Sequence, residues 1–212
     1  VFEKNKNVSI LEQLGFAHCR LSLAIPKEST FTGPEYFLNK KIATSYPRLL
    51  TEYLKENNIT AEIEEISGSV EIAPGIGLAD AVCDIVSSGS TLMTNGLREV
   101  STILKSQAVI ISNKNLDPQK QSILEKLLFR IRAVKNAKEN KYILLNAPLE
   151  ALHDICKILP GVKSPTILPL EEKGWCSIHS VVKEDEFWDR INQLKNAGAE
   201  GILVIPIEKM IL

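Results

Sequence analysis

The sequence predicts an α/β protein made of two parts that are built differently. Up to about residue 139, short segments with β-type patterns are interleaved with helical ones, which is typical of a parallel α/β sheet. From about residue 140 the expected order of elements becomes βαββαβ, the order of a small ferredoxin-like unit. A long amphipathic helix over Pro118–Lys138 separates the two patterns.

In the first part, three segments have the patterns of strands: Cys19–Ile25, Lys41–Thr44 and Ala61–Ile66. The run Ser45-Tyr46-Pro47 is expected to supply an N-cap, with a proline in the first turn, for a helical pattern over Arg48–Asn57. Leu78–Cys83 is interpreted as a short helix and Asp84–Val86 as a short apolar strand.

The remaining elements follow the same reasoning. Thr102–Ser112 is rich in β-forming residues, and the long helix after it places its apolar side chains on one face: Ile123, Leu127, Leu128, Ile131 and Val134. In the second part we expect four strands, at Tyr142–Leu145, Thr166–Leu168, Cys176–Val182 and Gly201–Ile205. Two helices, Pro148–Leu159 and Glu184–Asn196, complete the βαββαβ order.

The composition excludes several classes of protein. The 212 residues carry a formal net charge of -1, so we expect no overall attraction to nucleic acid or to an anionic membrane. The longest apolar stretches, such as Ala199–Ile207, are far shorter than the roughly 20 residues that span a bilayer, and no signal-type segment opens the chain. The four cysteines lack CxxC spacing and are expected to be reduced thiols. A soluble, cytoplasmic protein is the expectation.

The run Asp84–Leu92, DIVSSGSTL, has the clearest chemical meaning, because an acid near the end of an apolar strand precedes a loop of hydroxyl residues. Glycine lets a backbone approach a phosphate closely, and successive N–H groups form an anion-binding concavity. Hydroxyls can donate to phosphate oxygens, and Asp84 can accept hydrogen bonds from ribose hydroxyls. The expected phosphate-binding residues are Ser87, Ser88, Gly89, Ser90 and Thr91. The alternative is an ordinary surface turn, which uses the same residue types.

This loop resembles the phosphoribosyl pyrophosphate loop of phosphoribosyltransferases, with Asp84, Ser88, Gly89 and Thr91 at its fixed positions. More widely, Gly68–Val100, GSVEIAPGIGLADAVCDIVSSGSTLMTNGLREV, resembles the long-form ATP phosphoribosyltransferase family. Further matching segments are Arg20–Ala24, Ile42–Pro47, Lys141–Ile143, Ser164–Leu170 and Ile202–Met210. One departure is Cys83, where the family usually has a second acid.

The resemblance implies a catalytic region of two lobes, similar to a periplasmic binding protein, followed by a ferredoxin-like regulatory domain. Residues 1–25 and 101–139 would be the remainder of lobe I, and residues 26–100 would be lobe II with the loop. Residues 140–212 would bind histidine. Family members begin with a strand, a helix and a Gly-x-x-Asp segment that do not precede Val1 here, so we expect lobe I to be truncated at its N-terminus.

The reaction that the resemblance implies is the first step of histidine biosynthesis. An adenine ring nitrogen of ATP displaces pyrophosphate from phosphoribosyl pyrophosphate, with Mg²⁺ as cofactor, and positioning and charge stabilisation make a protein nucleophile unnecessary. Histidine is the implied feedback inhibitor, and dimers and hexamers are the implied assemblies. The implied histidine-binding residues are Asn146, Thr166 and Gly201, and no protein residue is assigned as a metal ligand.

Four further residues are candidates for the substrate cleft, each with a plainer explanation. Ser45 and Tyr46 precede an expected helix N-terminus, which attracts anions, although simple capping is the alternative. Glu71 follows a strand and could contact ribose or a magnesium-bound pyrophosphate, or else be a solvated carboxylate. Arg20 could face the cleft between the lobes.

Two other classes of function stay open at this point. Lobes that form a crevice also suit a solute-binding protein without chemistry. The second part alone could be an amino-acid-sensing module. The three histidines share no ligand spacing, so a metal site built on them is not expected.

Overall fold

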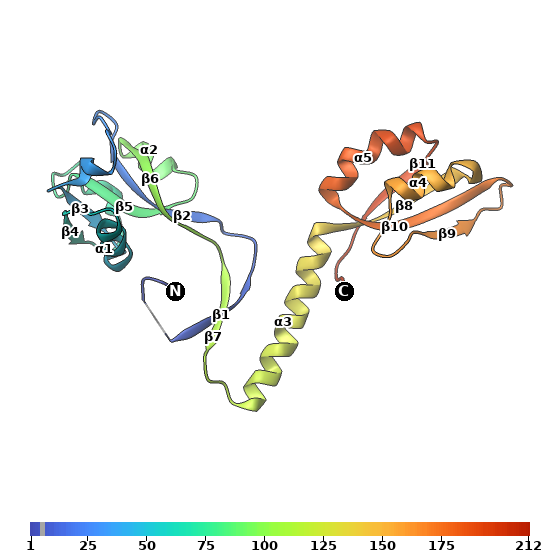
Figure 1. The fold of residues 1–212 in the computed structure, drawn as a ribbon, viewed down its shortest axis with the longest axis horizontal. Coiled ribbons are helices and arrows are strands. Elements are labelled where there is room, and N and C mark those ends of the chain that lie inside the picture. The colour runs from blue at the N-terminus through green and yellow to red at the C-terminus, as the bar shows by residue number, and fades with distance from the viewer. Residues whose placement is uncertain (5–6) are drawn as a thin grey trace. The chain divides into compact units, whose positions relative to one another are not determined.

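The computed structural model describes residues 1–4 and 7–212, which fall into two compact units, Val1–Leu116 and Asp117–Leu212 (Figure 1). The mixed α/β class expected from the sequence is confirmed in the first unit, and the ferredoxin-like order is confirmed in the second.

Five strands of the first unit form one sheet in the order β4-β3-β5-β2-β6. Their bounds are β2 (Cys19–Pro26), β3 (Lys41–Thr44), β4 (Glu62–Glu65), β5 (Ala81–Val86) and β6 (Leu97–Ser106). β3 runs parallel to β4 and β5, whereas β2 is antiparallel to β5 and β6. The expected parallel sheet is therefore wrong for β2 and β6. Parallel neighbours need a crossover, and the link from β3 to β4 supplies one through the ten-residue helix α1 (Pro47–Glu56).

Helical elements cover both faces of this sheet. They are η1 (Pro34–Phe37), α1, η2 (Val70–Ile72) and α2 (Ser90–Thr94). Leu50 of α1 is fully buried against one face, and Leu92 of α2 packs against the other. Successive residues of β5 point to these two layers in turn, so Val82 belongs to the α2 side and Cys83 to the α1 side.

The helix expected over Leu78–Cys83 is wrong. The chain turns at residues 78–80, and Ala81–Cys83 belong to the central strand β5 with no exposed surface. A short apolar run does not distinguish a buried strand from a buried helix, and here pairing to β3 and β2 decided the matter. Asp80 consequently ends a turn, where its carboxylate accepts the Lys41 N–H at 2.9 Å.

A separate antiparallel ribbon is formed by β1 (Val8–Gln13) and β7 (Val109–Asn113). No strand was expected before Cys19. The register of β1 shifts between Ile10 and Glu12, and such an irregularity interrupts the alternation that makes a strand recognisable. The β-rich segment expected over Thr102–Ser112 is in fact divided between β6 and β7.

The second unit begins with the long helix α3 (Pro118–Glu139), within one residue of its expected bounds. Asp117 is its N-cap, and one carboxylate oxygen accepts the N–H groups of Gln119 and Lys120, each at 3.0 Å. Of the expected apolar face, Leu128 is buried, but Ile123 is 67% exposed and Leu127 is 49% exposed. The helix itself is thus confirmed, but most of the apolar face expected for it is exposed among the described residues.

The rest of this unit is the βαββαβ module. Its elements are β8 (Asn140–Pro148), η3 (Leu149–Ala151), α4 (Leu152–Ile158), β9 (Thr166–Pro169), β10 (Trp175–Lys183), α5 (Glu184–Asn196) and β11 (Glu200–Pro206). The strand order is β11-β8-β10-β9 with every pair antiparallel, as in a ferredoxin-like unit. Side chains from β8 and β10 form one core with α4 and α5, including Leu145, Ile155 and Phe187.

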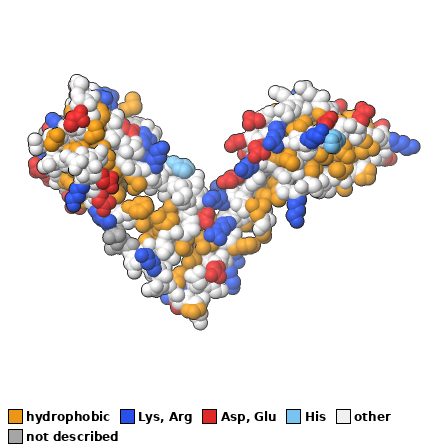
Figure 2. Space-filling view, in the orientation of Figure 1, with side chains coloured by type: hydrophobic (Ala, Val, Ile, Leu, Met, Phe, Trp, Pro, Cys, Tyr) orange, Lys and Arg blue, Asp and Glu red, His pale blue; other side chains and the backbone are white. Residues whose placement is uncertain are grey.

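By its contacts α3 groups with the second unit, whereas the sequence-based division placed residues 118–139 with the first part. The boundaries of the catalytic lobes remain predictions. Among the described residues, no helix is long and apolar enough to cross a membrane. Figure 2 shows acidic and basic side chains intermixed on the visible face.

Candidate functional site

The carboxyl ends of the three parallel strands β3, β4 and β5 lie at one edge of the five-stranded sheet. At this edge the chain leaves β3 through Ser45 and Tyr46, and leaves β5 into the loop Ser87–Gly89. The segment after β4 leads into η2, which carries Glu71. Ligands of open α/β sheets bind outside the carboxyl ends of strands, so this edge is where a site is expected.

A pocket of about 240 Å³ opens at this edge. It is lined by Glu71, Asp84, Ile85, Val86, Ser87, Ser88, Gly89, Thr91 and Leu92. Glu71 and most of the residues expected to bind phosphate and ribose are therefore brought together. Ser90 is the exception in the loop: its Oγ lies 2.9 Å from Ser88 Oγ, and it does not line the pocket.

The backbone of the loop depends on Gly89, whose φ of +84° lies in the left-handed region. An added Cβ there would approach nothing nearer than Val86 Cγ1 at 3.8 Å, so the requirement for glycine is conformational. Among the hydrogen bonds of the described residues, the amides of Ser88 and Gly89 donate none. These two N–H groups are available to a ligand.

Asp84 is the partly buried acid of the pocket. Its Oδ1 accepts a hydrogen bond from the N–H of the next residue, Ile85, at 2.7 Å. Burial raises the pKa of Asp84 and the negative charge of Glu71 raises it further, against the lowering effect of that hydrogen bond. Cys83, at the position of the family's usual second acid, faces the core on the α1 side, and burial raises its pKa to about 12.

Arg20, on β2 opposite Val86, is fully engaged at the base of the loop. Its Nε and Nη2 donate to the two carboxylate oxygens of Glu99 at 2.6 and 2.5 Å, and its Nη1 donates to the Ser87 carbonyl at 3.0 Å. The hydrogen bond from Arg20 lowers the pKa of Glu99. Sequence reasoning missed Glu99, although it stands in the matching segment NGLREV.

Ser45 and Tyr46 have local roles. Ser45 is not the N-cap of α1, because its Oγ donates to the Ile66 carbonyl at 2.6 Å and the cap residue is Tyr46. The first amides of α1 are satisfied by Glu3 instead, whose carboxylate accepts the N–H groups of Arg48 at 3.1 Å and Leu49 at 2.9 Å. The N-terminus of α1, which was expected to attract an anion, therefore binds the carboxylate of Glu3 from the same chain.

Tyr46 lies close enough to Asp84 to be affected by its charge. Burial raises the pKa of the Tyr46 phenol, and the negative charges of Asp84 and Glu3 raise it further. Tyr46 is thus beside the acid of the pocket, although it does not line the pocket itself.

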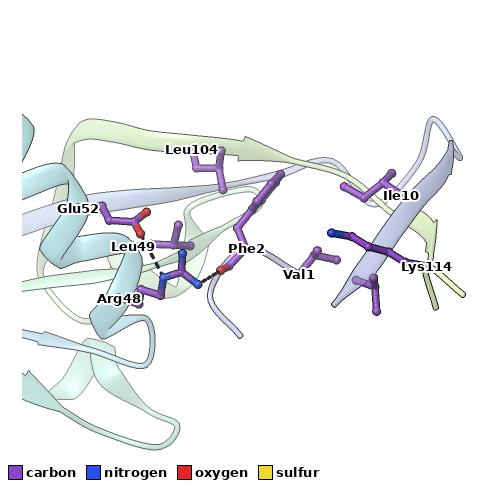
Figure 3. A pocket seen from close by; sticks show the side chains of 9 residues that line it. Val1, Phe2, Ile10, Arg48, Leu49, Glu52, Leu104 and Lys114 are labelled. Carbon is purple, nitrogen blue, oxygen red and sulfur yellow. Dashed lines mark hydrogen bonds and ion pairs between the residues drawn. The ribbon is translucent and has the colours of Figure 1, made fainter. Parts of the chain in front are cut away.

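A larger pocket of about 530 Å³ lies between α1 and the N-terminal residues (Figure 3). Figure 3 shows Phe2 and Leu104 beside Leu49, with Arg48 linked to Glu52 and to the Phe2 carbonyl. None of the predicted site residues lines it, and its lining offers no loop suited to phosphate. The smaller pocket is therefore the candidate substrate site.

In the second unit, two of the three residues predicted to bind histidine are neighbours. Gly201 has a φ of +56°, and a Cβ added to it would lie 3.7 Å from Asn146 Nδ2. Thr166 is on β9, where it pairs with His179 of β10. β9 is at the opposite edge of the sheet from β11, the strand that carries Gly201. The ring nitrogens of His179 lie 2.7 Å from Tyr142 Oη and 3.1 Å from Ser177 Oγ.

These features define an α/β protein with an acidic pocket and a glycine-containing loop at its sheet edge, joined to a ferredoxin-like module. A family model described as ATP phosphoribosyltransferase matches residues 1–133, and one described as HisG, C-terminal domain, matches residues 137–209. The chain therefore belongs to the ATP phosphoribosyltransferase family.

Curated relatives agree with this assignment. The ATP phosphoribosyltransferase of Azobacteroides pseudotrichonymphae is 61% identical over 99% of this chain and 74% of its own length. That of Cytophaga hutchinsonii is 58% identical over 99% of this chain and 73% of its own length. A solved chain of the ATP phosphoribosyl transferase HisG:HisZ complex from Thermotoga maritima has a TM-score of 0.57 at 27% identity, covering 64% of this chain and 65% of that one.

The predicted function, an enzyme of histidine biosynthesis in the phosphoribosyltransferase class of glycosyltransferases, is confirmed by these relationships. The two-lobed α/β fold expected for such an enzyme is consistent with the Thermotoga maritima structure. The alternatives, a solute-binding protein or an isolated sensing module, are not favoured, because the matched relatives are enzymes and the match covers nearly the whole chain.

Proposed function

We propose that phosphoribosyl pyrophosphate binds in the pocket beside the Ser87–Thr91 loop, and that ATP attacks it there to form phosphoribosyl-ATP and pyrophosphate. The observation that carries this proposal is the single pocket that joins two carboxylates, Glu71 and Asp84, to a glycine-containing loop with unpaired amides. A sugar phosphate needs this combination, because its hydroxyls donate hydrogen bonds and its phosphate accepts them.

The loop would hold the 5-phosphate. The amides of Ser88 and Gly89 are without protein acceptors among the described residues, and the hydroxyls of Ser87, Ser88 and Thr91 lie at the same pocket. Amides that are fixed before the phosphate arrives stabilise its charge without reorganisation during the reaction.

The carboxylate of Asp84, at the carboxyl end of β5, would accept hydrogen bonds from the ribose hydroxyls. Glu71 lines the same pocket from η2 and would contact the ribose or the magnesium-bound pyrophosphate. Two negative charges near the sugar also stabilise the positive charge that develops as pyrophosphate leaves. We infer that electrostatic stabilisation and positioning account for the chemistry.

No covalent intermediate with the protein is required. Among the described residues that line the pocket there is no His, Lys or Cys that could act as a nucleophile or activate a serine. Cys83, the nearest thiol in sequence, is buried in the core.

Mg²⁺ is the cofactor we propose for this reaction. The carboxylate oxygens of Glu71 and Asp84 are ligands that Mg²⁺ accepts, but no group of three or more metal-binding side chains occurs among the described residues. Mg²⁺ is commonly held by one or two carboxylates together with substrate phosphates and water, so these residues fit a cation that arrives with pyrophosphate. When bound, it would neutralise charge on the leaving group.

The substrate assignment can be tested with Asp84→Asn, which keeps the shape of the side chain and removes its charge. We expect formation of phosphoribosyl-ATP to fall by about a hundredfold or more, in line with the loss of one electrostatic contact to a transition state. Glu56→Gln, an exposed acid near the end of α1, is the matched control. Turnover by Asp84→Asn equal to that of the control would remove the pocket assignment.

For the second unit we propose that it binds histidine as a feedback inhibitor and contributes to dimers and hexamers. The nearness of Asn146 to Gly201, where an added Cβ would lie 3.7 Å from Asn146 Nδ2, supports a site where β8 pairs with β11. Calorimetry with histidine should show weaker binding for Asn146→Ala than for Asn192→Ala, an exposed position of α5. Sedimentation should show a histidine-dependent shift toward the larger assembly, and no response to millimolar histidine would contradict the proposal.

We also propose that the enzyme works in the cytoplasm. All four cysteines are free, as expected for a protein from a reducing compartment.

A further inference from the structure

We propose that Glu99 is a positioning residue for the substrate loop: it holds Arg20 so that the guanidinium fixes the Ser87 carbonyl and thereby aims the following amides at the pocket. This inference rests on the proposed function, because it takes the Ser87–Thr91 loop as the phosphate site. Neither Arg20 nor Glu99 lines the pocket, so both would act through the backbone of the loop.

The geometry of the guanidinium carries the first step. Arg20 uses Nε and Nη2 on the two oxygens of Glu99, which fixes the plane of its head group. The remaining nitrogen, Nη1, lies 3.0 Å from the Ser87 carbonyl oxygen. Because the guanidinium is planar and rigid, fixing two of its nitrogens also fixes the direction of the third.

The geometry of the peptide bond carries the second step. In a trans peptide the C=O of one residue and the N–H of the next point in opposite directions. When Arg20 holds the Ser87 carbonyl, the Ser88 N–H is directed away from Arg20. Among the described residues this amide donates to no protein acceptor, and Ser88 lines the pocket.

Glu99 is itself held in place, which makes it an anchor. Its Oε1 accepts a hydrogen bond from the Thr102 hydroxyl at 3.4 Å, and Thr102 Oγ1 in turn accepts one from the Ser22 hydroxyl at 3.4 Å. Ser22 is fully buried in β2, directly opposite Asp84 in the register. The network therefore joins Glu99 and Thr102 of β6 to Ser22 and Arg20 of β2, and through Arg20 to the loop that follows β5.

The test compares Glu99→Gln, Glu99→Asp and Arg20→Lys with the exposed control Glu56→Gln. The first readout needs no ligand: ¹⁵N relaxation order parameters of the Ser88 and Gly89 amides. We expect these to fall in Glu99→Gln and in Arg20→Lys, since a lysine cannot bind a carboxylate at two points and a carbonyl together. Glu99→Asp, which keeps the charge, should restore part of the order. The control should match the original protein.

The second readout is affinity for phosphoribosyl pyrophosphate by calorimetry with Mg²⁺. We expect about tenfold weaker binding for Glu99→Gln, the loss expected from one charge-assisted hydrogen bond acting through the loop. In the enzymatic assay the KM for phosphoribosyl pyrophosphate should rise by a similar factor while the KM for ATP stays constant. A general loss of folding would instead lower the apparent kcat and the melting temperature and leave both KM values unchanged.

The outcomes separate the two proposals. Unchanged loop order and unchanged affinity in both Glu99→Gln and Arg20→Lys would overturn the positioning role. Absence of phosphoribosyl pyrophosphate binding in the original protein would instead overturn the proposed function, and the order parameters would still decide whether Glu99 orders the loop.

Discussion

Glu71 of η2 and Asp84 of β5 line the same pocket, and the negative charge of Glu71 contributes to raising the pKa of Asp84. The larger cause is the burial of Asp84. Two elements that are separate in sequence thus set the ionisation of one acid, and this relationship has measurable consequences.

The affinity for phosphoribosyl pyrophosphate should rise with pH through the pKa of Asp84, because the ionised carboxylate is the form that accepts hydrogen bonds and binds Mg²⁺. The inflection should lie above the ordinary aspartate value of about 3.9, since burial and Glu71 both raise this pKa. Calorimetry over the acidic range measures it. Glu71→Gln should move the inflection to lower pH, and an unmoved inflection would contradict the interaction.

The same shift has a consequence for stability with a definite sign. A carboxyl whose pKa is raised by folding favours the folded state while it is protonated, so Asp84 should lower stability as the pH rises through its folded pKa. As the pH rises through that pKa, the free energy of unfolding of Asp84→Asn should therefore fall less than that of the original protein. Urea unfolding at several pH values measures the difference, and parallel pH profiles would contradict it.

Gly89→Val should disrupt the loop without disturbing the core. The φ of +84° places a β-branched side chain in a region that costs about 1–2 kcal/mol, while the space around the Cβ is open. We expect loss of phosphoribosyl pyrophosphate binding with only a small drop in melting temperature. Ser88→Ala, which keeps the backbone, is the comparison and should bind more tightly than Gly89→Val; the reverse order would argue against backbone amides as the main phosphate contacts.

Cys83 should resist alkylation in the folded protein. Its side chain has no exposed surface, and burial raises its pKa to about 12, so the reactive thiolate is essentially absent at neutral pH. Mass spectrometry after brief iodoacetamide treatment should find Cys19, which is partly exposed, modified before Cys83. Unfolded protein should be modified at both. Equal rates in the native state would show that β5 is not buried as described.

Leu145→Ala should destabilise the C-terminal unit by about 2–5 kcal/mol, the usual loss for a fully buried leucine. Both tryptophans, Trp175 and Trp188, are in this unit, so their fluorescence during urea unfolding reports on it alone. Leu168→Ala, at a position 47% exposed, is the matched control and should change stability by about 0.5 kcal/mol or less. Equal effects of the two substitutions would contradict the assigned core.

Local patterns allowed much of the fold to be predicted. The strand Lys41–Thr44 and the helix Glu184–Asn196 have the expected bounds, because their signals lie within the segments themselves. The failures have a physical cause in each case. Ala81–Cys83 is apolar in a way that suits either helix or strand, and Ser45, though a good capping residue, donates to the Ile66 carbonyl while Glu3 takes the helix terminus.

Some residues of the candidate site were also recognisable from the local sequence, and others were not. The loop from Ser87 to Thr91 and the acid before it were recognisable as a candidate site, because phosphate-binding loops commonly have glycine and hydroxyl residues at close spacing. Glu99 was not, since its partner Arg20 is 79 residues away in the chain. Nothing in the sequence around either residue indicates that the two side chains meet.

By itself the sequence determined most of the local elements, the ferredoxin-like order of the second unit and the residue types of the candidate loop, because each depends on residues close together in the chain. Only the tertiary structure decided that β2 lies between β5 and β6, that Glu71 and Asp84 line one pocket, and that Arg20 joins Glu99 to the loop. These are long-range pairings, and the free energy that selects them comes from burying and hydrogen-bonding groups that local patterns do not relate to one another.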